Sequence, residues 1–247
     1  MVRFVRCLAL FLAFISIAFT ESVSQLLTAP SYEPRLEEAA ERMNRAARGC
    51  LAPVYPYLAD YIVREFDLAE RPGIGIDLGS GPGDLIVALA RRTRSMYWIN
   101  ADINPYAFEY FFDSAAEAGV THRVGAVFAD AQRLPFRDAY ADVIVCRGSY
   151  HFWKDKGLAF SEIYRVLKPG GVAFIGRGFP ETMPVETARA VREKQKGGPK
   201  YDIEKSEAEL RDVMTALKIE DYRIMMPKRQ ETDVNYGIWV RFSKAGN

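Results

Sequence analysis

The sequence predicts an α/β fold, doubly wound around a mostly parallel sheet. Strand-like and helix-like segments alternate between residues 73 and 178, which is typical of βαβ units with right-handed crossovers. A turn with glycine at every second position, Gly79, Gly81 and Gly83, joins the first strand to a helix. The chain has 247 residues, enough for one domain of this class with a full core.

The chain before the glycine turn is expected to be helical. Residues 31–67 carry apolar side chains at helical spacing, and Pro53 and Pro56 punctuate this stretch. Because it directly precedes the turn, we expect residues 25–70 to form a helical cap over it.

Five strands and three helices are expected next, and together they make up the parallel part of the sheet. The strands are expected at residues 73–79, 96–103, 124–130, 141–148 and 171–178, and the helices at 84–92, 105–117 and 157–167. The turn at residues 168–171, with two glycines after a proline, is expected to stop the last helix and open the fifth strand.

The pattern changes after Phe179. Prolines bracket a charged helical stretch, and residues 201–217 predict an amphipathic helix. Two strand-like runs, 222–226 and 236–242, are close enough in sequence to pair as an antiparallel hairpin at one sheet edge. We expect residues 71–247 to form one domain, with 180–218 as a variable insert on the substrate side.

Charge and cysteine content argue against nucleic acid and metal ions as ligands. The formal net charge is +1, which implies no strong attraction to nucleic acid. The basic stretch 192–200 is interrupted by an acid and by a Gly-Gly-Pro turn, and is expected to be a solvated helix end. The three cysteines, Cys7, Cys50 and Cys146, lack metal-ligand spacing, and two histidines leave little for zinc. No metal site is therefore expected.

Polar residues gather where the predicted strands end, which is where open α/β sheets bind ligands. Asp77 ends the first strand, where a carboxylate can organise the turn or meet an ammonium group. Asp102 ends the second strand, about twenty residues beyond the glycines, and a carboxylate there can accept ribose hydroxyls. Asp130 ends the third strand, where it can accept from an adenine amine.

The end of the fourth strand carries the candidates for chemistry. His151 is a candidate general base because its unperturbed pKa is about 6.5, or it hydrogen-bonds only its own loop. Tyr150, like Trp153, either walls a substrate pocket or packs in the core. Arg147 and Arg177 can pair with an anionic substrate, with a carboxylate of a second ligand, or in structural ion pairs.

These residues carry a family resemblance. The spacing G-x-G-x-G, with an aspartate two residues before the first glycine, differs from the G-x-G-x-x-G of dinucleotide-binding proteins. Together with Asp102, Asp130 and the run Leu-Lys-Pro-Gly-Gly at 167–171, it resembles the class I S-adenosylmethionine-dependent methyltransferases over residues 73–178. The resemblance implies a Rossmann-like seven-stranded sheet whose last strand is antiparallel and inserted near the edge. It also implies that residues 77–83 hold the methionine moiety, Asp102 the ribose, and Asp130 with Ala131 the adenine.

Further segments resemble the small-molecule branch of that family. Residues 130–136 and 141–144 carry this likeness, and residues 147–149, 152–153 and 174–179 resemble a set of uncharacterised prokaryotic members. After the fourth strand stands Arg-Gly-Ser-Tyr in place of Asn/Asp-Pro-Pro-Tyr/Phe, which argues against methylation of nucleic-acid amines or glutamine. The thiols of an arsenic methyltransferase are also missing.

The leading hypothesis is an S-adenosylmethionine-dependent methyltransferase that acts on a small molecule by in-line displacement. The alternatives are a non-catalytic protein that binds the same cofactor and an NAD(P)-dependent oxidoreductase. The residues expected at the cofactor are Asp77, Gly79, Ser80, Gly81, Pro82, Gly83, Asp102, Ile103, Asp130, Ala131, Arg147 and Gly148. His151 and Tyr150 are expected in catalysis, and Trp153 and Arg177 at the acceptor.

The amino-terminal sequence indicates a different compartment from the one that a cytosolic cofactor requires. Two arginines precede an uncharged run over residues 7–20, so residues 1–24 have the shape of a signal peptide or signal anchor, and a membrane contact is possible. Such a segment would send the domain outward, away from a cytosolic cofactor. Either the anchor is inverted or translation starts at Met43. The compartment and the oligomeric state stay open.

Overall fold

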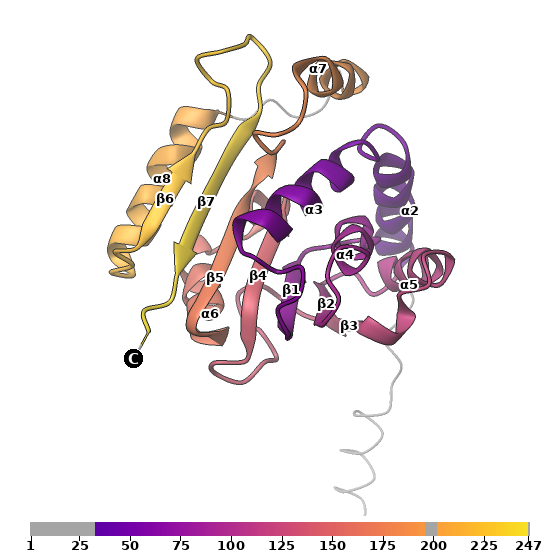
Figure 1. The fold of residues 1–247 in the computed structure, drawn as a ribbon, viewed down its shortest axis with the longest axis horizontal. Helices are drawn as coiled ribbons and strands as arrows, with labels where there is room; N and C mark the ends of the chain where they lie inside the picture. Colours follow the sequence, from indigo (N-terminus) through magenta and orange to yellow (C-terminus); the bar gives the residue numbers. More distant parts are fainter. Residues whose placement is uncertain (1–32, 196–201, 247) are drawn as a thin grey trace, which may run out of the picture. The chain divides into compact units, whose positions relative to one another are not determined.

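A seven-stranded sheet organises the part of the chain that the structure, a computed structural model, describes: residues 33–195 and 202–246 (Figure 1). Residues 36–247 form one compact unit and residues 1–35 another; all contacts given below lie within the first. The strands run in the order β3-β2-β1-β4-β5-β7-β6. Their bounds are β1 Gly73–Leu78, β2 Met96–Asp102, β3 Val124–Phe128, β4 Ala141–Arg147, β5 Leu167–Gly178, β6 Tyr222–Met225 and β7 Gly237–Ser243.

The direction of the last strand confirms the predicted sheet. The pairs β1–β2, β1–β4, β2–β3 and β4–β5 are parallel. Strand β7 pairs antiparallel with β5 on one side and with β6 on the other, so it is inserted next to the edge strand. The predicted hairpin between the last two strands is therefore present.

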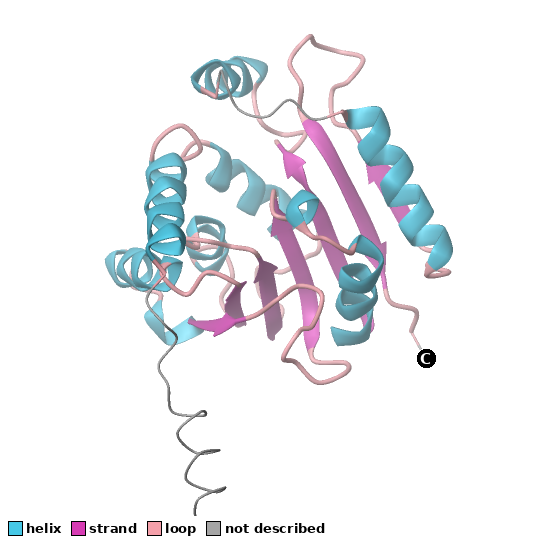
Figure 2. Cartoon of the chain, turned by 180° about the vertical axis from the view of Figure 1, so that it is seen from behind, coloured by secondary structure: helices cyan, strands magenta, loops and turns pink. Residues whose placement is uncertain are grey.

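Helices cover both faces of the sheet (Figures 1 and 2). One apolar cluster joins α3, α4 and α5 to one face, and a second joins α6 and α8 to the other. The helices are α2 Pro34–Arg48, α3 Val54–Glu65, α4 Asp84–Ala90, α5 Ala107–Glu117, α6 Lys156–Val166, α7 Val185–Lys194 and α8 Ile203–Ala216, with short 3₁₀ turns η1 Thr121–Arg123 and η2 Tyr150–Phe152.

The position of strand β4 in the sheet explains its run of successive apolar residues. Val143 and Val145 point to the cluster that contains α3 and α4. Ile144 and Cys146 point to the cluster that contains α6 and α8. Because side chains alternate between faces, the part of a strand that is covered on both sides is apolar at successive positions, as residues 143–146 are.

Most boundaries lie within two residues of the expected ones, and two elements differ by more. The helical stretch at 31–67 is two helices, since the chain turns after Gly49 and α3 starts directly after Pro53. Strand β5 begins at Leu167, which pairs with Ala141, whereas the next pair is Val143 with Val172. The Lys-Pro-Gly-Gly segment thus forms a bulge within the strand instead of preceding it.

A third apolar cluster lies beyond the ends of the parallel strands. It joins the first residue of α3, the helix α7 and the connection between β6 and β7. Within it, the Tyr236 hydroxyl donates to the Met183 carbonyl over 2.7 Å. The predicted signal segment, residues 1–24, lies outside the described residues. Among the helices that are described, none has the length and apolar character to span a membrane.

We predict that truncating Phe174 strongly destabilises the fold. Its ring stacks on Trp239 with centroids 4.6 Å apart and an angle of 5° between the planes, and it is 1% exposed. Phe174→Ala should lower the free energy of unfolding by about 3–5 kcal/mol, measured by urea denaturation. Phe112→Ala is the control, because Phe112 is 44% exposed and should lose less than about 1 kcal/mol. Equal losses would contradict the packing described.

Candidate functional site

The turn between β1 and α4 needs its glycines. Gly79, Gly81 and Gly83 have φ values of 65°, 56° and 76°, in the left-handed region that other residues avoid. A side chain would also find no room, because a Cβ at Gly79 would collide with Ser149 and one at Gly83 with Phe111. The turn therefore presents bare backbone at the carboxyl end of β1.

Side chains of β2 hold this turn in place. The Gly81 N–H donates to Asp102 Oδ2 over 2.7 Å, and Asn100 Nδ2 donates to the Gly81 carbonyl over 2.9 Å. Both backbone polar groups of Gly81 are thus tied to the neighbouring strand. We did not predict the role of Asn100. A signal was available, because a buried amide within an apolar strand needs partners.

Asp102 is the last residue of β2, and both of its carboxylate oxygens accept backbone hydrogen bonds. Its second oxygen, Oδ1, accepts the Asn104 N–H over 2.8 Å. Burial raises the pKa of Asp102, although the N–H groups of Asn104 and Gly81 oppose the rise. A carboxylate has about four lone-pair sites, so Asp102 can still accept hydrogen bonds from a ligand.

Asp77 is a buried carboxylate with an unused oxygen. It is 2% exposed, and its Oδ1 has no hydrogen-bond partner in the described protein. Burial raises the pKa of Asp77 to about 7; the Ser80 side chain and the Arg147 charge oppose this rise, and the Asp102 charge adds to it. Ser80 Oγ is also buried, and no group of the described residues meets it with hydrogen-bond geometry. Unpaired buried polar atoms are costly, so these two are suited to a ligand.

Arg147 ends β4 and faces the same region. Its Nε is buried and has no hydrogen-bond partner in the described chain, and its guanidinium lies 5.7 Å from the centre of the Tyr55 ring. Burial raises the pKa of Tyr55 to about 12, against the opposing charge of Arg147. Gly148, next in sequence, has φ 96° and donates its N–H to the Gly176 carbonyl.

His151 is held by Arg177. Arg177 Nη1 lies 3.3 Å from His151 Nε2, and because a guanidinium only donates, Nε2 must accept and Nδ1 must carry the proton. That Nδ1 is buried with no partner in the described residues. Burial, then the charges of Arg177 and Lys156, lower the pKa of His151 to about 4. Its one lone pair is occupied, which speaks against the predicted general base.

The aromatic residues after β4 divide into two groups. Tyr150 is 2% exposed and belongs to the core cluster under α6, which argues for packing and against the predicted catalytic role. Trp153 is half-buried against the same cluster, with its ring 5.9 Å from that of Phe160. Phe152 is 75% exposed, and its ring centre lies 3.9 Å from that of His151.

The predicted adenine side combines a tight turn with exposed apolar groups. Asp130 Oδ1 accepts the Gln132 N–H over 2.9 Å, and the half-buried Ala131 lies between these two residues. Ile103, directly after β2, and Phe128, the last residue of β3, are 55% and 60% exposed. A flat apolar ligand could therefore be covered on this side.

Helix α2 comes close to the glycine turn. A Cβ at Gly81 would collide with the side chain of Met43. Asn104 Nδ2 donates to the Leu36 carbonyl over 2.7 Å. Helix α2 therefore lies beside the turn and the end of β2, while Tyr57 packs against the third apolar cluster.

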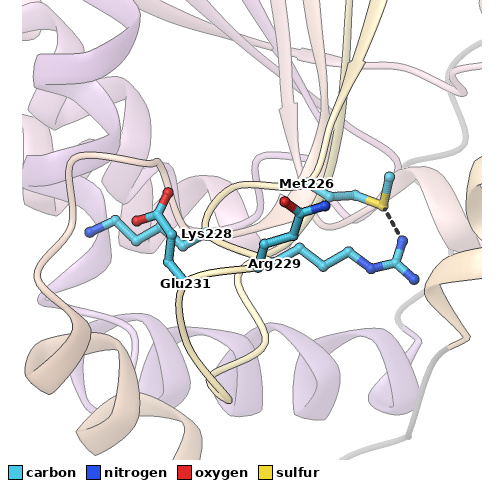
Figure 3. A pocket seen from close by; sticks show the side chains of 5 residues that line it. Met226, Lys228, Arg229 and Glu231 are labelled. Atoms are coloured by element: carbon cyan, nitrogen blue, oxygen red, sulfur yellow. Dashed lines mark hydrogen bonds between the residues drawn. The ribbon is translucent and has the colours of Figure 1, made fainter.

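A separate hollow of about 290 Å³ lies in the connection between β6 and β7 (Figure 3). Met226, Lys228, Arg229, Gln230 and Glu231 line it. Arg229 is engaged there, because its Nη1 donates to Met226 Sδ over 3.0 Å. No cluster of three potential metal ligands occurs in the described part of the chain.

The sheet order, the inserted antiparallel strand and the glycine turn tied to an acidic second strand are those of the class I S-adenosylmethionine-dependent methyltransferases. Comparison with known families agrees: residues 76–175 match the family described as "Methyltransferase domain". This match covers β1 to β5 and hence the strand ends described above. The chain thus contains a methyltransferase domain of this class.

Individual relatives point the same way. The ubiquinone/menaquinone biosynthesis C-methyltransferase UbiE of Vibrio vulnificus is 38% identical over 103 residues, which cover 41% of this chain and 40% of the relative. The chain thus spans about two-fifths of the length of this curated relative. A solved structure from Methanococcus maripaludis, assigned as an S-adenosyl-L-methionine-dependent methyltransferase, superposes with a TM-score of 0.76 at 29% identity, covering 89% of this chain and 98% of that one. A methyltransferase of Aquifex aeolicus shares the fold, with a TM-score of 0.60 at 17% identity over 84% of this chain and 97% of that one.

We predict that Asp77→Asn stabilises the ligand-free protein. The pKa of Asp77 is about 7 in the folded protein and 3.8 in the unfolded chain. Between these values the unfolded chain has lost the proton and the folded protein keeps it, so the folded state loses stability as the pH rises. An amide removes that cost, on the order of 2–4 kcal/mol at pH 8. Thermal unfolding should show a higher Tm for the variant at pH 8, a smaller gain at pH 5, and none near pH 3.5. A gain that does not depend on pH would contradict a buried ionised carboxylate.

Proposed function

We propose that this protein transfers a methyl group from S-adenosylmethionine to a small-molecule acceptor. The observation that carries the proposal is the set of buried polar atoms at the glycine turn that lack partners in the described protein: Asp77 Oδ1, Ser80 Oγ and Arg147 Nε. They surround bare backbone within the segment that matches a methyltransferase domain. Such atoms are costly in a folded protein unless a ligand uses them.

The donor set fits the cofactor. The Asp77 carboxylate suits an ammonium group, and Arg147 with Gly148 borders the same end of the turn. Asp102 would accept from the ribose. Asp130, Ala131 and the exposed Ile103 would border the adenine. When bound, the cofactor supplies an activated methyl group on a sulfonium. Its positive charge suits a site with three buried or partly buried carboxylates, Asp77, Asp84 and Asp102.

The protein's part in the reaction is mainly to position the reactants. Alignment of reacting groups can contribute on the order of 7–11 kcal/mol. The turn is rigid because Asn100 and Asp102 tie it to β2, and helix α2 places Met43 against it. These contacts hold the backbone in place and help to exclude water.

Two observations support a small-molecule acceptor. The relatives named UbiE are C-methyltransferases of ubiquinone/menaquinone biosynthesis, and the net charge of +1 does not favour nucleic acid. Nothing in the site favours the non-catalytic or the NAD(P)-dependent alternative. The domain division and the role of residues 1–24 remain predictions.

Titration calorimetry with S-adenosylhomocysteine tests the cofactor site. We expect saturable binding to the full chain and none of comparable affinity for NAD. Asp102→Ala should weaken binding by about 10–100-fold, because hydrogen bonds to charged groups contribute about 1.5–3 kcal/mol.

Asp113→Ala, at an exposed position on α5, is the matched control and should bind like the wild type. A thermal melt of each variant separates lost binding from lost folding. Absence of saturable binding by the folded wild-type protein would refute the proposal, and turnover of labelled S-adenosylmethionine over a metabolite panel would then identify the acceptor.

A further inference from the structure

Unpartnered buried polar atoms of the described structure occur in two places at the carboxyl edge of the sheet. On the side of β1, β2 and α4 they are oxygens of Asp77, Ser80, Asp84 and Asn100, and Arg147 at the end of β4 acts on Asp77. In the loop after β4, the unpartnered atom among the described residues is the N–H donor His151 Nδ1. This loop therefore offers a ligand one buried hydrogen-bond donor.

Two cations act on this donor. Arg177 and Lys156 both act on His151, and Lys156 also pairs with Glu209 at 3.0 Å. Within the loop, the charges of Lys154 and Asp155 cancel. The surroundings of His151 therefore favour an anion, whereas the carboxylates Asp77, Asp84 and Asp102 lie on the turn side, where Arg147 and Arg48 act on the first two.

We infer that the methyl acceptor binds as an aromatic oxyanion whose oxygen accepts a hydrogen bond from His151 Nδ1–H, with Arg177 as the residue that holds this tautomer. This inference rests on the proposed function and names the substrate class for the same site. Arg177 acts from the opposite ring nitrogen, since its Nη1 donates to Nε2 over 3.3 Å. Without that donor, either nitrogen of the neutral ring could carry the proton.

Phe152 supplies the reason for an aromatic acceptor. Its side chain is 75% exposed, and its ring centre is 3.9 Å from the imidazole of His151. An acceptor whose oxygen meets Nδ1–H can therefore lay an apolar ring against Phe152. An acceptor that binds already ionised has no proton left to remove from that oxygen, which agrees with the occupied lone pair of His151.

Benzoate and benzamide are a matched pair of probes, because they differ in charge and share one ring. Full-length protein is first saturated with S-adenosylhomocysteine, and each probe is then titrated while the imidazole ¹⁵N signals of His151 are followed by NMR. We expect the Nδ1–H tautomer before addition, and benzoate should bind at least 10-fold more tightly than benzamide and shift the Nδ1 signal. His151→Phe should abolish this preference.

Arg177→Gln tests the positioning role. It should mix the two His151 tautomers in the ¹⁵N spectrum and weaken benzoate at least fivefold, and Arg177→Lys should restore part of both. Arg189→Gln removes an exposed arginine that pairs with Asp233 and is the control, expected to match the wild type. Thermal melts confirm that each variant folds.

The outcomes separate the two proposals. If S-adenosylhomocysteine binds but benzoate and benzamide bind equally, or if His151→Phe keeps the preference for benzoate, the oxyanion inference is overturned and the methyltransferase proposal stands. An Nε2–H tautomer in the wild type would also overturn it. If S-adenosylhomocysteine does not bind at all, both proposals fail together.

Discussion

Two side chains of β2 fix the turn on which the site is built. Asp102 accepts the Gly81 N–H, and Asn100 donates to the carbonyl of the same residue. Three glycines in the left-handed region give the turn no side chains at these positions, and a glycine-rich segment without anchors can adopt many conformations. Because its anchors come from the neighbouring strand, the turn depends on the parallel pairing of β1 with β2.

The same arrangement explains why the site works against the stability of the fold. Asp77, Asp84 and Asp102 all have a raised pKa because they are removed from water. Asp77 keeps one oxygen without a partner in the described protein. A cationic ligand would supply the missing charge and hydrogen bonds. Burial of these carboxylates therefore lowers the free energy of unfolding, and binding of a cation would offset this loss. Such destabilising groups are common at functional sites.

The two sides of the site carry different charges, which would orient a cationic and an anionic ligand within it. Carboxylates lie around the turn, with Arg147 and Arg48 acting on two of them, whereas Arg177 and Lys156 act on His151 in the loop that follows β4. A cation on the first side and an anion on the second would each be stabilised by the nearer groups. The field of the protein thus favours a positive and a negative reactant in adjacent places.

The strands and helices, the closing hairpin and the strand ends where the site lies could be predicted from the sequence, because period, glycine spacing and acidic residues are local signals. The roles of individual side chains became clear only from the folded chain. Asn100 anchors the turn and Tyr150 packs in the core. His151 is a neutral donor because Arg177, 26 residues away on another strand, occupies its other nitrogen. The protonation and exposure of a side chain depend on neighbours that are distant in sequence, and no local pattern records them.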